Sequence, residues 1–449
     1  MIKKMLIANR GEIAVRIIRV CREMEIETVA VYSVADKEAL HTQLADEAVC
    51  IGGASSEDSY LNMESIISAA VTHGADAIHP GFGFLSENPQ FAKLCKQCNI
   101  TYIGPDYTVI EKMGNKVAAR QTMINAKIPV VPGTNNEIKD LNHALQEAEK
   151  TGYPVIVKAA SGGGGKGIRV AYNKDELKSG FLAACKESMA SFGDDTMYME
   201  KFIENPRHIE FQILADNYGN VIHLGERDCS IQRHHQKILE EAPSVVLSEN
   251  QRKEMGKMAV RAAKAAGYKN AGTVEFLLDK TGKYYFMEMN TRIQVEHPIT
   301  ESITGIDIVK EQILIAQGEK LKLKQNDIKL TGHAIECRIN AEIPEKNFMP
   351  SPGTIVALHF PGGNGIRTDS AAFSGYTVPP YYDSMLAKLI VHGKDRNEAI
   401  MKMKSALGEV VIEGVHTNID YAYDIINNKD YISGNFDINF LEHFNWNKG

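Results

Sequence analysis

The first 110 residues alternate between short apolar runs and segments in which hydrophobic residues recur at helical spacing. The run Met5–Ala8 comes first, and Ile13, Ile17, Val20 and Met24 follow at intervals of three or four. The alternation continues with a β-rich run at 28–32, a helical pattern at 65–71 and an apolar run at 75–79. This βαβα order predicts a parallel sheet covered by helices on both faces.

The pattern changes in the middle of the chain. Turn residues at 128–133 indicate a boundary, which is followed by a helical pattern at 140–151 and an apolar strand at 154–160. Further along, the strands become longer and pair as hairpins, with turns expected at 217–220 and 279–282. We therefore expect a small mixed unit followed by a larger α+β unit.

A glycine-rich loop follows the predicted strand at 154–160. Lys158 lies near the end of that strand, and five of the six residues 162–167 are glycine. Without side chains, such a loop leaves its backbone N–H groups free to surround a phosphate. It lacks the GxxxxGK[ST] spacing of a P-loop, and a flexible linker would rarely begin on a buried strand. The segment predicts phosphate binding, with Lys158 beside it.

Two acidic residues lie in one predicted hairpin. If 279–282 is the turn, Leu278 pairs with Lys283, and Glu275 and Glu288 share a face as diagonal neighbours roughly 7–8 Å apart. Two carboxylates this close in apolar surroundings resist ionisation. A hard divalent cation such as Mg²⁺ relieves that conflict. A solvated face is the alternative, but the aromatic neighbours favour a buried metal site.

Four polar residues of different types continue the same alternation after the hairpin, namely Asn290, Arg292, Gln294 and Glu296. In an extended segment they form one row. Asn290 can complete a metal shell, and Arg292 can hold a small oxyanion in a bidentate fork. Glu296 can take a proton from that anion. An exposed amphipathic strand is the alternative, but it seldom carries four chemical types with so few lysines.

Composition narrows the classes of function. The 449 residues are 44% hydrophobic and 24% charged, as in ordinary globular proteins. The net charge of -7 argues against a nucleic-acid partner, and no apolar stretch approaches the ~20 residues that span a bilayer. Seven scattered cysteines fit reduced thiols in the cytoplasm. Cys95 and Cys98 form a CxxC without the second pair that a zinc site needs.

Taken together, these motifs resemble the biotin carboxylase family. The matching segments run in order from about residue 5 to at least 420, at 9–14, 79–81, the glycine-rich loop, 199–201, 226–230, 235–237, 288–297, 336–340 and 379–384. The resemblance implies the ATP-grasp fold, of α/β and α+β class. Its expected parts are an N-terminal Rossmann-like domain (1–113), a helical linker (114–130), a small lid domain (131–203) and a larger C-terminal mixed domain (204–449).

The resemblance also implies roles for individual residues. The ATP-binding positions are Lys116, Lys158, Gly164, Gly165, Glu200, Lys201, Ile203, His208, His235, Lys237, Glu275, Leu277 and Glu288. The metal positions are Glu275, Glu288 and Asn290, and the bicarbonate and biotin positions are Arg292, Gln294, Val295 and Arg338. The catalytic positions are Glu296, as general base, together with Arg338, Arg292 and Lys237.

The implied activity is that of an ADP-forming ligase. Glu296 deprotonates bicarbonate, which attacks the γ-phosphate of ATP. Mg²⁺ or Mn²⁺ is expected to be bound, with two ions in the site. The resulting carboxyphosphate yields CO₂ and phosphate, the phosphate deprotonates biotin, and Arg338 stabilises the enolate that captures CO₂. The expected partners are a biotin carboxyl carrier protein, carboxyltransferase subunits and a second copy of the chain. Acetyl-CoA carboxylase in cytoplasmic fatty acid synthesis is the expected context, and a pyruvate or other acyl-CoA carboxylase is the alternative.

Three further points qualify this interpretation. The sequence Met401-Lys402-Met403 is similar to the one around biotinyl-lysine, but it lies in a predicted helix at 397–411, so we expect biotin on a separate carrier. In the last ~25 residues we recognise no motif. A carbamoyl-phosphate or purine-pathway ATP-grasp ligase and a non-catalytic nucleotide sensor are the competing functions. The Arg292–Glu296 row favours bicarbonate chemistry over both.

Overall fold

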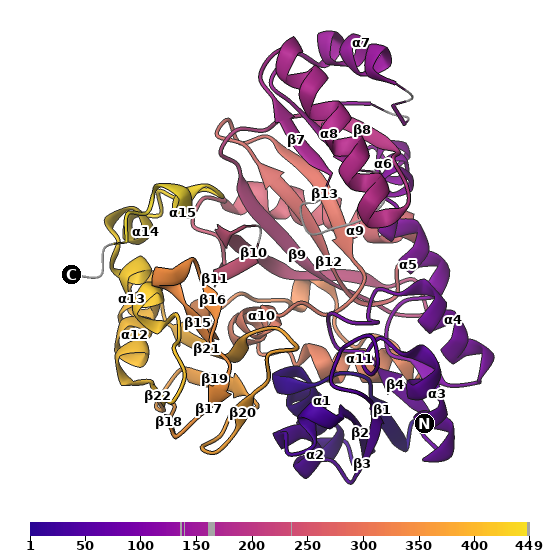
Figure 1. Ribbon diagram of the computed structural model, residues 1–449, viewed down its shortest axis with the longest axis vertical. Coiled ribbons are helices and arrows are strands. Elements are labelled where there is room, and N and C mark those ends of the chain that lie inside the picture. The colour runs from indigo at the N-terminus through magenta and orange to yellow at the C-terminus, as the bar shows by residue number, and fades with distance from the viewer. Residues whose placement is uncertain (135–136, 139, 160–166, 235, 447–449) are drawn as a thin grey trace.

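The structure, a computed structural model, describes residues 1–134, 137–138, 140–159, 167–234 and 236–446. The N-terminal part is a parallel sheet in the order β3-β2-β1-β4-β5. Its strands are β1 (Lys4–Ile7), β2 (Glu27–Ser33), β3 (Glu47–Gly52), β4 (Ala77–His79) and β5 (Thr101–Tyr102). Helix α1 (Gly11–Glu23) packs on one face, whereas α3 (Met63–Thr72) and α4 (Pro89–Gln97) pack on the other (Figure 1). The predicted βαβα arrangement is confirmed.

Strand β1 lies at the centre of this sheet because both of its faces are apolar. Met5 and Ile7 pack with the residues of α1, and Leu6 packs with those of α3 and α4. Beyond the strand, the Asn9 side chain donates hydrogen bonds to the carbonyls of Pro80 and Phe82, both at 2.7 Å. The loops after β1 and β4 are thereby joined at the carboxyl edge of the sheet. Short elements on the same part of the chain are η1 (Val34–Asp36) and α2 (Leu40–Leu44).

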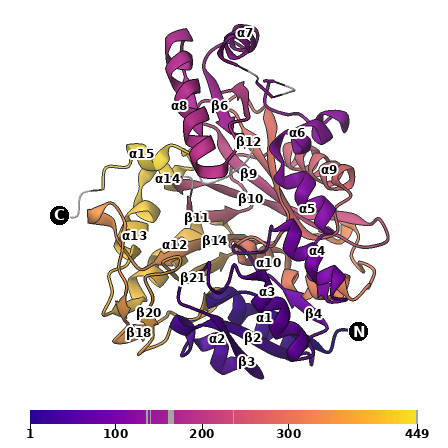
Figure 2. The same cartoon turned by 45° about the vertical axis from the view of Figure 1, so that its right-hand side comes forward.

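Two helices lead from this sheet to a small unit. Helices α5 (Tyr107–Gly114) and α6 (Lys116–Asn125) precede an antiparallel sheet of β6 (Val155–Ala159), β7 (Ile168–Ala171) and β8 (Met197–Lys201), in the order β7-β6-β8. Helices α7 (Leu141–Thr151) and α8 (Lys174–Phe192) cover it. Both views place α7 and α8 at the end of the molecule opposite β1, β2 and β3 (Figure 1, Figure 2).

The remainder of the chain is built on an eight-stranded antiparallel sheet in the order β13-β12-β9-β10-β11-β14-β21-β19. Its strands are β9 (Arg207–Ala215), β10 (Val221–Arg233), β11 (Gln236–Ala242), β12 (Asn270–Leu278), β13 (Tyr284–Asn290), β14 (His333–Asn340), β19 (Ile366–Ser370) and β21 (Met385–Gly393). Both predicted hairpins, β9–β10 and β12–β13, are present. The long central strands carry the polar residues of the candidate site.

Helices cover both faces of this sheet. They are α9 (Glu249–Ala266), α10 (His297–Thr304), α11 (Ile308–Ala316), α12 (Arg396–Glu409), α13 (Ile419–Asn427), α14 (Lys429–Ser433) and α15 (Phe440–His443). Short elements complete the C-terminal part, namely η2 (Gln325–Asp327), β15 (Glu342–Ile343), η3 (Pro344–Lys346), β16 (Met349–Pro350), β17 (Gly353–Thr354), β18 (Ala357–His359), β20 (Thr377–Val378) and β22 (Val411–Glu413). Within the described residues, no helix has both the length and the apolar character needed to cross a membrane.

The C-terminal part contains Lys402 and the segment without a recognised motif. Lys402 lies within α12, where its ammonium donates a hydrogen bond to the His392 carbonyl at 2.8 Å and pairs with Glu398 at 3.0 Å. It is therefore held in a helix, as predicted, and not on a hairpin turn. The segment without a recognised motif is also packed, because Phe444 and Trp446 contact Tyr421 edge-on and Phe440 stacks on Phe444.

Candidate active site

A cavity of about 330 Å³ opens between the small unit and the β13 edge of the large sheet. Its walls come from α5 and α6 on one side, β6 and β8 on another, and β13 on the third. The polar lining residues are Glu87, Lys116, Arg120, Tyr198, Glu200, Glu288, Asn290 and Thr291. Apolar side chains such as Ile110, Val130 and Phe286 fill the remaining walls. A mixed lining of this kind suits a ligand with one flat apolar part and one charged part.

Lys116 and Arg120 of α6 line the cavity, and Lys158 of β6 lies beside it. Lys158 Nζ donates to Glu200 Oε2 at 2.6 Å, and Arg120 Nη1 donates to Glu200 Oε1 at 3.0 Å. Burial alone would lower the pKa of Lys158, but the Glu200 carboxylate outweighs it and the pKa is raised. Burial lowers the pKa of Lys116, with Glu288 opposing the shift. The predicted ammonium groups therefore lie where a polyanion entering the cavity can meet them.

The register of the β12–β13 hairpin differs from the prediction. The Asp279 N–H donates to the Lys283 carbonyl at 2.8 Å, so Leu278 pairs with Tyr284 and not with Lys283. A register shift then falls between residues 275 and 276 of β12, which leaves Met287 without a paired residue on β12. In consequence, Glu275 lies directly opposite Glu288 rather than diagonally from it. The shared face was predicted correctly, and the predicted diagonal separation was wrong.

The pKa values of Glu275 and Glu288 reflect their direct pairing and their neighbours. Burial raises the pKa of Glu288, and the Glu275 carboxylate raises it further. Burial also opposes ionisation of Glu275, but Lys237 and His208 outweigh it and lower the pKa of Glu275 below its usual value. Asn290 Nδ2 donates to Glu275 Oε1 at 2.8 Å, so the third predicted metal residue joins the pair. Glu275 is therefore ionised, whereas ionisation of Glu288 is unfavourable. A cation between the two carboxylates would stabilise the ionised form of both.

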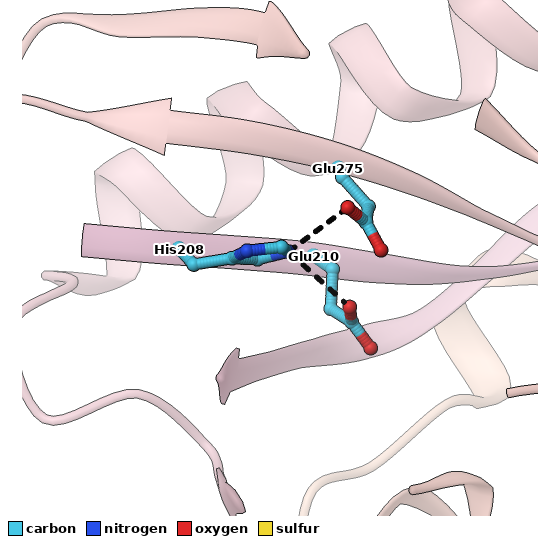
Figure 3. Close-up of side chains that lie close together, drawn as sticks. All are labelled: His208, Glu210 and Glu275. Atoms are coloured by element: carbon cyan, nitrogen blue, oxygen red, sulfur yellow. Dashed lines mark ion pairs between the residues drawn. The ribbon is translucent and has the colours of Figure 1, made fainter. Parts of the chain in front are cut away.

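Next to this pair lies a group of three residues, His208, Glu210 and Glu275 (Figure 3). His208 Nε2 is 3.0 Å from Glu275 Oε2 and 3.6 Å from Glu210 Oε2. Burial would lower the pKa of His208, but the Glu275 carboxylate dominates and raises it to about 9. Figure 3 shows both carboxylates turned toward the imidazole. The imidazole is thus a second cation that competes with a metal ion for Glu275.

Glu210 was not predicted as a site residue, although it lies in the alternating run of β9. It is fully buried and pairs with Lys237 at 2.5 Å and with Arg227 at 2.6 Å. Burial opposes the charge on Glu210, but the two cations lower its pKa. Glu210 thereby links the predicted phosphate-binding Lys237 to the centre of the sheet. The polar residues alternating along β9 were the available signal.

Glu296 lies beside this network and is fully buried. Its Oε1 accepts a hydrogen bond from Lys237 at 2.6 Å, and its Oε2 accepts one from Arg338 at 3.1 Å. Burial would raise the pKa of Glu296, but Lys237 and Arg338 outweigh the neighbouring acid Glu210 and lower it. Glu296 is therefore an ionised carboxylate without solvent contact, which is the state that a general base requires.

The chain does not reach Glu296 through an extended row. Strand β13 ends at Asn290, the chain bends at 291–292, and Glu296 is the residue before the first turn of α10. The prediction of one continuous extended row was wrong, because a helix that begins with His297-Pro298 requires a turn before it. The side chains still converge on one region through this turn.

Arg292 is held from several sides. Its Nε donates to Glu87 Oε2 at 2.8 Å, its Nη1 to Gln294 Oε1 at 2.9 Å, and its Nη2 to Asn290 Oδ1 at 3.4 Å. Glu87 also accepts the N–H of Thr291 at 3.1 Å. Glu87 belongs to the loop after β4, so the N-terminal sheet contributes directly to the site. No pattern in the sequence pointed to Glu87, since its partners lie about 200 residues away.

The remaining predicted residues are placed as follows. Gln294 Nε2 is 3.3 Å from Glu275, and the Val295 carbonyl accepts a hydrogen bond from Lys388 at 2.9 Å. Lys201 Nζ donates to the carbonyls of Gly152 and Tyr153, at 3.2 and 2.6 Å. Leu277 lies on β12 opposite His208, and Ile203 follows β8; both are partly buried. Gly164, Gly165 and His235 lie outside the described residues.

Comparison with known families covers nearly the whole chain. The family described as the biotin carboxylase N-terminal domain matches residues 1–110, and the biotin carboxylase C-terminal domain matches 336–443. Between them, the ATP-binding domain of the carbamoyl-phosphate synthase L chain matches 115–324. The middle match alone would fit the carbamoyl-phosphate alternative. The two flanking matches distinguish the families.

Individual relatives agree with the flanking matches. Biotin carboxylase 1 of Bacillus subtilis is 59% identical over 445 residues, covering 99% of each chain. A pyruvate carboxylase subunit of Methanothermobacter thermautotrophicus is 52% identical over 444 residues, 99% of this chain and 90% of the relative. The biotin carboxylase domain dimer of Hydrogenobacter thermophilus 2-oxoglutarate carboxylase, solved with MgADP, ADP and bicarbonate, is 51% identical with a TM-score of 0.96, covering 100% of both chains. This chain belongs to the biotin carboxylase family and is an ATP-dependent ligase with the ATP-grasp fold.

Proposed function

We propose that this enzyme uses ATP and bicarbonate to carboxylate the biotin of a separate biotin carboxyl carrier protein, through carboxyphosphate. The observation that carries the proposal is the buried, ionised Glu296 between Lys237 and Arg338, with Arg292 four residues earlier in the chain. A base that cannot be reached by bulk solvent suits an intermediate that water would destroy. The bicarbonate and MgADP bound in the Hydrogenobacter thermophilus relative support bicarbonate as a substrate and ADP as a product.

In the first step, Glu296 takes the proton of bicarbonate that Arg292 and Gln294 bind. A bicarbonate oxygen then forms a bond to the γ-phosphorus of ATP, and the bond between that phosphorus and the bridging oxygen of ADP breaks. Lys116, Lys158 and His208 balance the phosphate charge, and Lys237 contacts the phosphate while it holds Glu296. Closure of the small lid domain over ATP excludes water from carboxyphosphate.

In the second step, the carbon–oxygen bond of carboxyphosphate breaks and gives CO₂ and phosphate. The phosphate takes the proton from N1′ of biotin, and N1′ then forms its bond to CO₂. Negative charge develops on the ureido oxygen of biotin, where the Arg338 guanidinium stabilises it. Arg338 already contacts Glu296 at 3.1 Å, so both steps take place at one site.

The residues that would hold Mg²⁺ or Mn²⁺ are Glu275, Glu288 and Asn290, with two ions proposed. The fit rests on the directly opposed acids of the hairpin and on the raised pKa of Glu288. Glu210 offers a further carboxylate oxygen close to Glu275. A bound divalent ion neutralises the nucleotide phosphates and polarises them.

Phosphate release from ATP tests this proposal. The purified enzyme is assayed with Mg-ATP in bicarbonate-depleted buffer, then with added bicarbonate, and then with bicarbonate and free biotin. We expect release to depend on bicarbonate and to rise again with biotin. A rate that ignores both additions contradicts the proposal, and a rate that instead responds to ammonia favours the carbamoyl-phosphate alternative.

For the physiological context, we propose the first half-reaction of acetyl-CoA carboxylase in fatty acid synthesis, in a cytoplasmic homodimer that works with carboxyltransferase subunits. The 59% identity to Biotin carboxylase 1 of Bacillus subtilis, of which this chain covers 99%, supports it. The relative from the pyruvate carboxylase of Methanothermobacter thermautotrophicus supports the alternative of a pyruvate or other acyl-CoA carboxylase. An assay distinguishes the two contexts. The enzyme first carboxylates the biotin of a carrier protein, and the carboxylated carrier is then offered to each carboxyltransferase in turn. The domain boundaries after residues 113, 130 and 203 stay predictions.

A further inference from the structure

Lys388 of β21 is a fully buried lysine that the proposed reaction does not use. Its ammonium forms an ion pair with Glu12 Oε1, a residue of the first turn of α1, at 3.0 Å, and lies 3.9 Å from Asp369 Oδ2 on β19. Both acids are buried as well. Lysine is rarely buried completely, because burying a charge is costly unless the charge is paired. A lysine in this position therefore requires an explanation.

The acids around Lys388 keep it charged. Burial would lower the pKa of Lys388, but the neighbouring carboxylates, that of Glu12 first, outweigh burial and raise the pKa. Asp369 is also bound by Arg367, whose Nε and Nη2 donate to its two oxygens at 2.9 and 2.7 Å. Glu12 is thus the acid that lies closest to the ammonium. The N-terminal sheet, through α1, thereby contributes the counter-ion of a lysine in the large sheet.

The ammonium of Lys388 also binds the backbone next to the proposed base. Lys388 Nζ donates to the Val295 carbonyl at 2.9 Å, and Val295 directly precedes Glu296. The carbonyl before it, that of Gln294, is bound by His297, whose backbone N–H donates at 3.3 Å and whose Nδ1 lies 2.8 Å away. Two successive carbonyls of the turn before α10 are therefore tied to the protein interior.

The direction of these carbonyls determines the direction of the N–H groups in the same peptides. In a planar trans peptide, the N–H points opposite to the C=O. The Val295 N–H therefore points away from His297, and the Glu296 N–H points away from Lys388. Among the described residues, neither N–H donates to a backbone carbonyl. Successive N–H groups left free in this way can bind a small anion, and Val295 was expected at the bicarbonate position.

We propose that Lys388 is a positioning residue for the bicarbonate site, because it fixes the peptide between Val295 and Glu296 while Glu12 holds its ammonium in place. The inference rests on the function proposed above, in which bicarbonate binds beside Val295 and Glu296 takes its proton. Without the hydrogen bond from Lys388, this peptide can rotate, and the rotation displaces the backbone that carries the base. Lys388 is not among the residues that line the 330 Å³ cavity, so ATP binding does not depend on it.

The test measures two Michaelis constants in the same variant. Lys388→Met keeps the apolar stem and removes the ammonium. We expect the KM for bicarbonate to rise about 10-fold and kcat/KM for bicarbonate to fall by up to about 10²-fold, since a displacement of about 1 Å at a reacting group can cost that much. The KM for Mg-ATP should not change. A smaller folded fraction would lower kcat and leave both KM values as in the wild type, so the difference between the two KM values reports on positioning.

Arg252→Met is the matched control. Arg252 of α9 donates from Nε to both oxygens of the buried Glu226 at 2.8 Å, so this variant also leaves a buried acid without its cation. We expect a lower melting temperature and an unchanged KM for bicarbonate. A KM for bicarbonate that rises as much in Arg252→Met as in Lys388→Met would overturn the positioning role.

A double variant separates the hydrogen bond from the balance of charge. Lys388→Met combined with Glu12→Gln removes both charges of the pair, so it should regain melting temperature relative to Lys388→Met, because no buried charge is left without its partner. The KM for bicarbonate should stay raised, since the Val295 carbonyl still lacks its donor. If Lys388→Met does not fold, the double variant carries the test. A double variant with the wild-type KM for bicarbonate would show that only charge balance matters, and would overturn the inference.

Failure of this inference differs from failure of the proposed function. A wild-type enzyme without bicarbonate-dependent ATP cleavage overturns the proposed function itself. A wild-type enzyme with that activity, combined with a Lys388→Met variant whose KM for bicarbonate is that of the wild type, overturns only the role of Lys388.

Discussion

Lys237 is the cation on which the buried acids of the site depend most. Its ammonium lies 2.5 Å from Glu210, 2.6 Å from Glu296 and 3.2 Å from Glu275. All three carboxylates are buried, and each owes a lowered pKa partly to Lys237. The variant Lys237→Met keeps the apolar stem and removes the charge. We expect it to destabilise the enzyme in a way that depends on pH and on Mg²⁺.

The magnitude follows from these distances. With an effective dielectric constant of about 20, each contact corresponds to about 5–7 kcal/mol of Coulomb attraction before the cost of burying the charges. Removing one partner of a buried ion pair costs a net ~3–5 kcal/mol. At about 2.1 cal/mol/K of unfolding entropy per residue, a cooperative chain of 449 residues loses about 1 °C of melting temperature per kcal/mol. The expected loss at pH 8 is therefore about 3–5 °C.

The dependence on pH has a definite sign. In the wild type, Glu210 and Glu275 have lowered pKa values, so their stabilisation is present above the unfolded pKa and is lost as the pH falls. In Lys237→Met the acids repel one another and their pKa values rise, so stability is lost as the pH increases through the raised values. The difference in melting temperature between wild type and variant should widen from pH 5.5 to pH 8.

Melting curves recorded by scanning fluorimetry at both pH values, with and without Mg²⁺, measure this difference. Mg²⁺ should narrow it at pH 8, because the ion takes over part of the neutralisation. Lys201→Met is the control, since that ammonium contacts the backbone carbonyls of Gly152 and Tyr153. Its effect should not change with pH between 5.5 and 8. Equal losses at both pH values for Lys237→Met would refute the electrostatic reasoning.

Three further predictions address single residues. Glu296→Gln should lower bicarbonate-dependent ATP cleavage by about 10²–10⁴-fold in a phosphate-release assay while ATP binding, measured by calorimetry, is retained; unchanged turnover would contradict the role of a base. Glu87→Gln should raise the KM for bicarbonate about 10-fold or more, because Arg292 loses its charge-assisted hydrogen bond, and an unchanged KM would exclude this role of Glu87. Glu288→Gln should raise the melting temperature at pH 8 without metal, since it removes an acid whose pKa is raised beside Glu275, and should weaken Mg-ATP binding; a lower melting temperature would contradict it.

The architecture could be predicted from the sequence where both faces of a strand are apolar. Met5, Leu6 and Ile7 mark such a strand, and the helical spacing after Gly11 marks the helix that covers it. These patterns depend on neighbouring residues, so they are visible in one sequence. The same applies to the His208–Glu210 alternation on β9, whose polar side chains point together into the site.

Register and direction were less predictable. The shift beside Glu275 follows from how the turn at Asp279 closes, and the residues around Met287 carry no signal for it. The turn before α10 was signalled by Pro298, which favours the first turn of a helix, but the polar alternation suggested a strand instead. For residues 290–296, the types of side chain predicted the chemistry of the site, whereas the polar alternation did not predict the course of the backbone.

Contacts between distant segments could not be predicted at all. Glu87 reaches Arg292 across 205 residues, and Glu240 reaches Arg338 across 98. Neither acid stands out among its neighbours in the sequence, because its role arises from the partner that the fold brings to it. The resemblance to a family supplied Arg338, but not the acid behind it.

The transfer of oxygen from bicarbonate to phosphate tests the central claim most directly. The enzyme is incubated with Mg-ATP, biotin and ¹⁸O-labelled bicarbonate, and the phosphate is analysed by mass spectrometry. If a bicarbonate oxygen attacks the γ-phosphorus, the phosphate formed carries one label from bicarbonate, and the Glu296→Gln variant forms little of it. Unlabelled phosphate released at the full biotin-stimulated rate would mean that water is the nucleophile, and the account of Glu296 and Arg292 would be wrong.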